Sequence, residues 1–437
     1  MVGECPRRRH RNAWRPDRVA VLPGIDGPTG VAERWGGEWK GFDVSHRAIA
    51  QRLRELLDEN PDLAAGLERS LVQARQVAEE GLKDELLEAL PWPQSVAEYV
   101  DYIDDFARWV PRETDSPAWR AQAPQHRYAQ EVSDRLSHFF WIIDQKADGH
   151  DTSVAYGSDT FREWVTDFAR DWGSFLDTPE SFGPDVLKSF VDNAPEYHVG
   201  DSMIDGKPNA PSGWMTFNQF FARELNGGLR PIAEPGSNLV ITSPADCSFQ
   251  HRYDIDDASN IPATTIKDTH KYGNICTLLT GSEYAEKFAG GTFAHYMLPT
   301  YAYHRFHLPV GGVIKESFVT HGQAFMQVEL SDHGLKGQDN AETGFEFFQT
   351  RGVVIIDTTD SPCGDIGTVA VVCVGMQNVA SVTLTCTPGK HMAKGDEFGY
   401  FSFGGSDIIL LFQKRVEIDI DTAEETHLVG VPVARCG

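Results

Sequence analysis

We predict an α+β fold, with a helical N-terminal extension followed by a compact, mostly antiparallel β sandwich or barrel. Two observations along the 437 residues support this fold class. Apolar side chains recur at helical spacing up to about residue 225, whereas short β-rich runs between Gly and Pro turns follow Pro231. We therefore expect a disordered basic tail at residues 1–40, a helical domain at residues 41–213 and a β-rich domain at residues 214–437.

Three apolar stripes predict the helices of the first domain. Their members repeat every three or four residues, which places them on one face of a helix. Ser95 and Glu98 have the spacing of a capping box at the start of the second stripe. Such stripes are usually buried, so we expect a structural or substrate-gating role. The stripes are Ile49, Leu53, Leu56 and Leu57; Val96, Tyr99, Val100, Ile103, Phe106 and Val110; and Phe161, Trp164, Val165, Phe168, Trp172 and Phe175.

Short runs of β-branched and aromatic residues predict the strands of the second domain. Turn residues separate them at the spacing of an antiparallel sandwich or barrel. The polar, Gly-containing segment 336–343 predicts a loop. The predicted strands are residues 292–297, 352–357, 369–374, 379–386, 398–403, 408–412 and 416–420.

Charge and cysteine content exclude several classes of partner. Asp and Glu total 64 against 39 Lys and Arg, giving a formal net charge of -25. An acidic surface repels phosphate backbones and anionic lipid heads, so we expect no nucleic-acid partner and no stable membrane insertion. The seven cysteines include no Cys-x-x-Cys pair, which favours free thiols in the cytoplasm. The sequence leaves homo-oligomerisation open.

Polar residues in the β-rich half are candidates for catalysis. Asp246 can orient a histidine, although an Asp in this position is more often a turn residue. His304 and His307 are candidate bases, although histidines at this spacing are more often surface or core residues. A zinc site would need a third ligand, so we predict no metal.

The segment around Ser406 is a candidate for self-cleavage. Two glycines precede Ser406, so its hydroxyl can attack the carbonyl of Gly405 if a base removes the proton. A hairpin turn is the alternative. Residues 394–399 predict a turn that leads into the preceding strand.

Taken in order, these motifs resemble the phosphatidylserine decarboxylase family of pyruvoyl enzymes. Six motifs occur in the family's order, from about residue 214 to residue 416, so the probability of a chance match is very small. The helical extension and the Gly-Gly-Ser cleavage site are similar to soluble relatives that decarboxylate aromatic amino acids such as tryptophan. The motifs are residues 216–223 with 229–232, 243–246, 303–309 with Gly311, 374–376 with Val379 and Ser381, 394–399 and 403–406.

The resemblance implies a proenzyme that cuts itself between Gly405 and Ser406. His307, oriented by Asp246, would take the Ser406 proton, and Ser406 would become the pyruvoyl group, with no external cofactor. The two fragments would stay associated. A substrate amine would form an imine with this group, which withdraws electrons while the α-carboxylate leaves. His304 would contact that carboxylate or deliver a proton, and the two histidines can exchange roles.

Four functions remain in view. The first is decarboxylation of a free amino acid, for example tryptophan, by a carboxy-lyase. The second is phosphatidylserine decarboxylation to phosphatidylethanolamine, because most of the motifs are shared with those enzymes. The third is an uncleaved, non-catalytic binding module. It is supported by two departures from the family pattern, Asp407 in place of Ser or Thr and Cys247 in place of Gly. A metallohydrolase that uses the two histidines ranks last.

Overall fold

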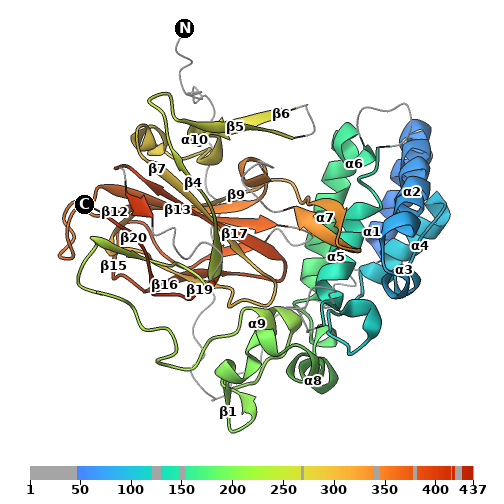
Figure 1. Ribbon diagram of the computed structural model, residues 1–437, viewed down its shortest axis with the longest axis horizontal. Coiled ribbons are helices and arrows are strands. Elements are labelled where there is room, and N and C mark those ends of the chain that lie inside the picture. Colours follow the sequence, from blue (N-terminus) through green and yellow to red (C-terminus); the bar gives the residue numbers. More distant parts are fainter. Residues whose placement is uncertain are drawn as a thin grey trace, which may run out of the picture. The chain divides into compact units, whose positions relative to one another are not determined.

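Helices form the first part of the described chain and strands form most of the second, which confirms the predicted fold class (Figure 1). The computed structural model describes residues 47–120, 129–146, 153–266, 270–338, 345–376, 381–414, 416–418 and 426–436. These residues belong to one compact unit. The predicted basic tail, residues 1–40, lies outside the described ranges.

The three predicted apolar stripes are confirmed as α1, α4 and α7. α4 begins where the capping box predicts, because the Ser95 hydroxyl accepts a hydrogen bond from the Glu98 backbone N–H over 3.3 Å. It ends at Phe106, one turn before the predicted Val110. None of the described helices is long and apolar enough to cross a membrane. The helices are α1 (Arg47–Glu59), α2 (Pro61–Gly81), α3 (Asp84–Ala89), α4 (Val96–Phe106), α5 (Glu131–Trp141), α6 (Val154–Gly157), α7 (Asp159–Phe175), α8 (Pro184–Asn193), α9 (Phe217–Phe221) and α10 (Ile275–Leu278).

An eight-stranded antiparallel sheet forms the centre of the β-rich part. Its two edges are β15 and β19, so the described strands do not close a barrel. In spatial order the strands are β15 (His391–Met392), β9 (Gly312–Thr320), β12 (Arg351–Asp357), β13 (Thr368–Met376), β17 (Gly405–Phe412), β7 (Thr292–Leu298), β4 (Cys247–Asp254) and β19 (Thr426–His427).

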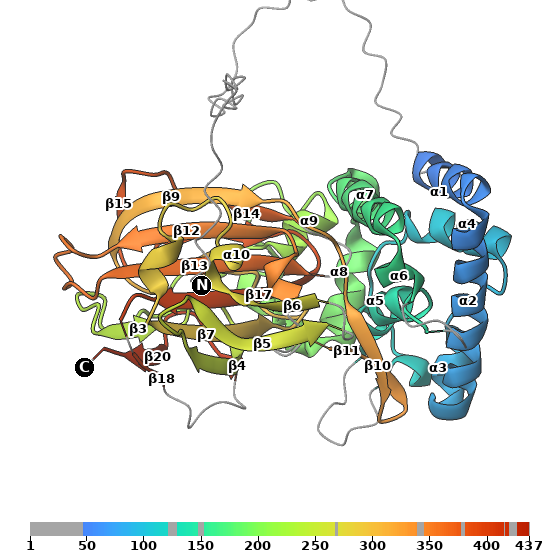
Figure 2. The ribbon, with the colours of Figure 1, turned by 90° about the horizontal axis from the view of Figure 1, so that it is seen from above.

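Both faces of this sheet are buried. Figure 2 shows helices α1, α2, α4 and α7 to one side of the strands. Side chains alternate between the faces of a strand. Ile408 and Leu410 therefore pack into one apolar cluster, and Ile409 and Leu411 pack into another that includes the helices. Two small sheets contribute to the first cluster: β14 (Val382–Leu384), β16 (Glu397–Phe401) and β8 (Arg305–His307); and β18 (Glu417–Ile418), β20 (Pro432–Arg435) and β3 (Val240–Thr242).

The prediction of a loop at 336–343 is wrong for residues 336–338, and residues 339–343 lie outside the described ranges. The β10 strand (Gln327–Ser331) pairs with β11 (Gly334–Gln338) through a turn in which Asp332 and His333 adopt φ of 51° and 60°. This hairpin packs on α5, where tertiary contact outweighs the local polar composition. Sequence patterns also missed β4, β9 and the hairpins of β1 (Met203–Ile204) with β2 (Lys207–Pro208) and of β5 (Asn260–Ile266) with β6 (His270–Asn274).

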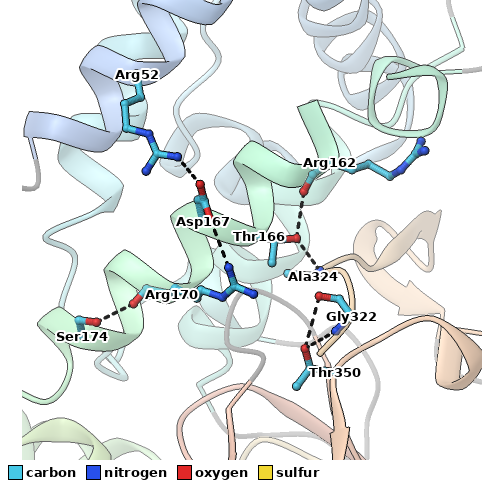
Figure 3. Close-up of polar contacts among 9 residues, drawn as sticks. All are labelled: Arg52, Arg162, Thr166, Asp167, Arg170, Ser174, Gly322, Ala324 and Thr350. Atoms are coloured by element: carbon cyan, nitrogen blue, oxygen red, sulfur yellow. Dashed lines mark hydrogen bonds and ion pairs between the residues drawn. The ribbon is translucent and has the colours of Figure 1, made fainter. Parts of the chain in front are cut away.

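Hydrogen bonds attach α7 to the β-rich part (Figure 3). The Thr166 hydroxyl donates to the Arg162 carbonyl over 2.9 Å and accepts from the Ala324 N–H over 3.2 Å. Asp167, one residue further along α7, pairs with Arg52 of α1. The helix therefore contacts both another helix and the connection between β9 and β10.

Candidate active site

Ser406 lies at the start of the central strand β17 and is fully buried. Its cross-strand neighbours are Gly375 on β13 and Leu298 on β7. Gly404 precedes the strand with φ of 151°, a conformation that residues with side chains rarely adopt. The Gly-Gly-Ser segment therefore enters a strand and does not form the alternative hairpin turn.

His304 contacts Ser406 directly. The His304 Nδ1 atom lies 3.3 Å from Ser406 Oγ, and its Nε2 atom lies 3.3 Å from the carbonyl oxygen of Thr300. Because a carbonyl only accepts, Nε2 carries the ring proton and Nδ1 accepts from the serine hydroxyl. The ring is buried and stacks on Phe221 at 4.0 Å, and this burial lowers the pKa of His304 to about 3. A neutral imidazole therefore faces the Ser406 hydroxyl.

His307 and Asp246 contact other groups. The His307 Nδ1 donates to the Gly395 carbonyl over 2.9 Å, and its Nε2 lies 3.2 Å from the Tyr303 hydroxyl. Burial lowers the pKa of this ring as well. Asp246 accepts from Arg230 Nε over 2.9 Å and from the backbone N–H of Val429 over 2.8 Å.

The structure thus brings Ser406 together with His304. Among the described residues, no hydrogen bond joins His307 to Asp246 or either of them to Ser406. The chain of contacts that the family resemblance implies is therefore not formed among the described residues. Sequence spacing alone gave no signal for choosing between the two histidines.

The two departures at positions 407 and 247 leave the Ser406–His304 contact intact. Asp407 points to the opposite face of β17 from Ser406, and its Oδ2 lies 3.0 Å from Nε2 of buried His295 on β7. Cys247 is buried at the start of β4, and this burial raises the pKa of its thiol to about 12. The sequence analysis missed His295, although it lies on a predicted strand.

A cavity of about 880 Å³ is lined by neighbours of Ser406 and His304, although these two buried residues do not themselves line it. It reaches Leu298, the cross-strand neighbour of Ser406, and Thr300, which binds His304. Its walls come from the helical part and the β-rich part together. Lining residues include Lys83, Glu113, Gln130 and Ser133 from the first, and Asp246, Leu298, Thr300 and Tyr303 from the second, with Glu196, Tyr197, Arg223 and Arg230 between them.

The part of the chain that contains Ser406 and His304 is similar to known proteins. Residues 217–431 match the family model described as phosphatidylserine decarboxylase. The chain is 34% identical over 209 residues to the phosphatidylserine decarboxylase proenzyme of Chlamydia trachomatis serovar L2, covering 48% of this chain and 63% of that protein. It is 30% identical over 252 residues to phosphatidylserine decarboxylase proenzyme 2 of Oryza sativa subsp. japonica, covering 57% and 36%.

A third relative is matched over more of its own length. The phosphatidylserine decarboxylase proenzyme of Clostridium novyi is 29% identical over 264 residues, which cover 60% of this chain and 79% of that protein. The matched region contains Asp246, both histidines and Ser406. Residues 217–431, just under half of the chain, are therefore similar to the phosphatidylserine decarboxylase family.

Proposed function

We propose that this chain is a carboxy-lyase made as a proenzyme, which cuts itself between Gly405 and Ser406 and converts Ser406 into a pyruvoyl group. The hydrogen bond between Ser406 and His304 carries the proposal. The buried Ser406 is next to the neutral His304. Gly404, which has no side chain, lowers the steric resistance to attack on the Gly405 carbonyl. The relatives' description as proenzymes implies a pyruvoyl group, and these residues fit the formation of that group.

The residue roles follow from the contacts. Ser406 acts as the nucleophile toward the Gly405 carbonyl, and His304 accepts its proton through Nδ1. The Thr300 carbonyl holds the imidazole in the required tautomer. Once formed, the pyruvoyl group supplies an electron-withdrawing carbonyl to a substrate amine. His307 and Asp246 remain the alternative base and its orienting carboxylate, as the family resemblance implies.

Phosphatidylserine is the leading substrate candidate, because the three relatives compared above carry its name. A free amino acid, including an aromatic one such as tryptophan, is the second candidate. The second is favoured by a specific observation: polar residues of the helical part, including Glu113, Gln130 and Ser133, line the cavity. These side chains can hydrogen-bond the polar groups of a free amino acid, although most of the cavity lining is apolar.

Intact mass under denaturing conditions tests the cleavage. We expect two fragments, residues 1–405 and residues 406–437, the second beginning with a pyruvoyl group. Ser406→Ala should remain one chain, while Ser402→Ala, a nearby serine outside the site, should be cut normally. A single uncut wild-type chain would contradict the proposal and favour the non-catalytic binding module.

Release of carbon dioxide then separates the substrates. Purified cut protein would be offered phosphatidylserine vesicles and, separately, each free amino acid. Turnover of the vesicles alone supports phosphatidylserine decarboxylation. Turnover of a free amino acid alone supports the second candidate.

A further inference from the structure

Arg223 is a buried cation whose donors are only partly used. Its side chain is 3% exposed. One terminal nitrogen donates to the Phe220 carbonyl over 3.4 Å and the other donates to the Tyr197 carbonyl. The Nε atom has no hydrogen-bond partner, and no ion pair to Arg223 is found among the residues that the structure describes.

A comparison with Arg351 shows that this arrangement is unusual in the same protein. Arg351 is equally buried, yet its Nε and both terminal nitrogens donate to carbonyls over 2.6 to 2.9 Å. Arg230, which lines the same cavity as Arg223, is paired with the Asp246 carboxylate through two nitrogens. Arg351 has the contacts of a structural residue, and Arg230 has a direct ion pair. Arg223 has neither among the described residues, although the charges of Asp201 and Asp246 act on it from further away.

A buried guanidinium without a counter-ion is costly to desolvate. Burial lowers the pKa of Arg223 only to about 10, so the group stays charged at neutral pH. Its planar donors are suited to bind a carboxylate. An anion entering the cavity would therefore gain a strong partner.

Arg223 also lies near the Ser406–His304 pair. It lines the cavity together with Leu298 and Thr300, which neighbour Ser406 and His304 respectively. Phe221, two residues earlier in the chain, stacks directly on the His304 ring, and the Arg223 charge acts on that ring. The cation is therefore close to His304, whereas Ser406 itself is fully buried and does not line the cavity.

We propose that Arg223 binds the α-carboxylate of the substrate, and this inference rests on the proposed decarboxylase function. The guanidinium holds the carboxylate while the substrate amine is directed toward position 406. When the bond between the α-carbon and the carboxyl carbon breaks, the electron pair stays on the α-carbon side and neutral carbon dioxide leaves. The product then lacks the anion that Arg223 recognised, so it binds less tightly than the substrate.

Binding to the uncut Ser406→Ala protein tests this role without relying on turnover. Calorimetry would compare two pairs of ligands that differ only in the carboxylate: L-tryptophan with tryptamine, and glycerophosphoserine with glycerophosphoethanolamine. For at least one pair, we expect the carboxylate-bearing member to bind about tenfold or more tightly. Arg223→Gln should remove that difference and leave unchanged the affinity for the member that lacks the carboxylate. Arg223→Lys should retain part of the difference.

Arg351→Gln is the matched control, because it removes an equally buried arginine outside the cavity lining. It should lower thermal stability and leave the affinity difference intact. Arg223→Gln could instead lower the affinity for both ligands of a pair equally, with the fold intact by circular dichroism. That result would assign Arg223 a structural role or, for the glycerophospho pair, a contact with the phosphate. Binding of neither pair, or an unchanged difference, would also overturn the proposal.

The outcome can be separated from that of the proposed function. If wild-type protein remains uncut while the Arg223 result is as expected, the carboxylate site stands and the decarboxylase assignment fails. If the protein is cut and releases carbon dioxide but the Arg223 variants bind both ligands as the parent does, only the assignment of Arg223 as the carboxylate-binding residue is wrong.

Discussion

The Oδ2 atom of Asp407 lies 3.0 Å from the Nε2 atom of His295, and both side chains are buried on the face of β17 opposite Ser406. The pairing follows from the register: Asp407 is opposite Met297 and His295 is opposite Ile409, so the two side chains meet diagonally across neighbouring strands. Asp407 therefore has a partner on the face of β17 that points away from the Ser406 hydroxyl.

His295→Ala should destabilise the fold strongly, because it leaves the buried Asp407 carboxylate without its imidazole. We expect a loss of about 3–5 kcal/mol in the free energy of unfolding. Urea unfolding in the Ser406→Ala background, where every molecule is uncut, gives the measurement. His391→Ala, at an exposed histidine, should change stability by less than about 0.5 kcal/mol. A loss below about 1 kcal/mol in His295→Ala would mean that the His295–Asp407 pair contributes little to the free energy of unfolding.

His304→Ala should slow self-cleavage by about 100-fold or more, because the neutral imidazole is hydrogen-bonded to the nucleophile. His307→Ala should have a smaller effect, because its nitrogens contact Gly395 and Tyr303. The rate would be followed by gel after refolding the denatured, uncut chain. Rapid cutting of His304→Ala together with a block in His307→Ala would restore the assignment implied by the family resemblance.

Self-cleavage should keep its rate as the pH falls from 8 to 5. Burial lowers the pKa of His304 to about 3, so the ring stays neutral and able to accept a proton throughout this range. A histidine with its ordinary pKa of about 6.5 would lose most of its base form by pH 5. Single-turnover rates at each pH, corrected for the folded fraction, distinguish the two profiles.

Glu113→Gln should stabilise the protein above about pH 5. Burial raises the pKa of Glu113 to about 9, above its unfolded value of about 4.5, so its contribution is fully present below pH 4.5 and is lost as the pH rises through 9. The variant does not titrate, so its advantage should grow by up to about 1.4 kcal/mol per pH unit within this window. Thermal melts from pH 5 to 9 give the trend, and the exposed Glu88→Gln should show none.

Local signals in the sequence predicted the elements that form by local rules. The Ser95 cap and the apolar stripe after it located α4, and the alternating runs located β7, β12, β13 and β17. The β10–β11 hairpin was missed because its strands are stabilised by packing on α5, which the local composition does not encode.

The site was predictable as a set of residues but not as a set of contacts. His304 and His307 are three residues apart, and which of them reaches Ser406 depends on where β8 begins. The strand starts at Arg305, so His304 lies just before it and is buried in the interior. Arg223 belongs to a recognised motif, yet its unmatched charge appears only when Tyr197 and the cavity are placed around it.

The proposed cleavage before Ser406 would have a consequence for refolding. The short fragment, residues 406–437, would supply a strand that is paired on both sides, with β13 and with β7. A molecule that unfolds after this cut would have lost a covalent link across the middle of its largest sheet. Its refolding would require two separate peptides to meet and would depend on their concentration. Folding as a unimolecular reaction would then be open to the chain only before it is cut.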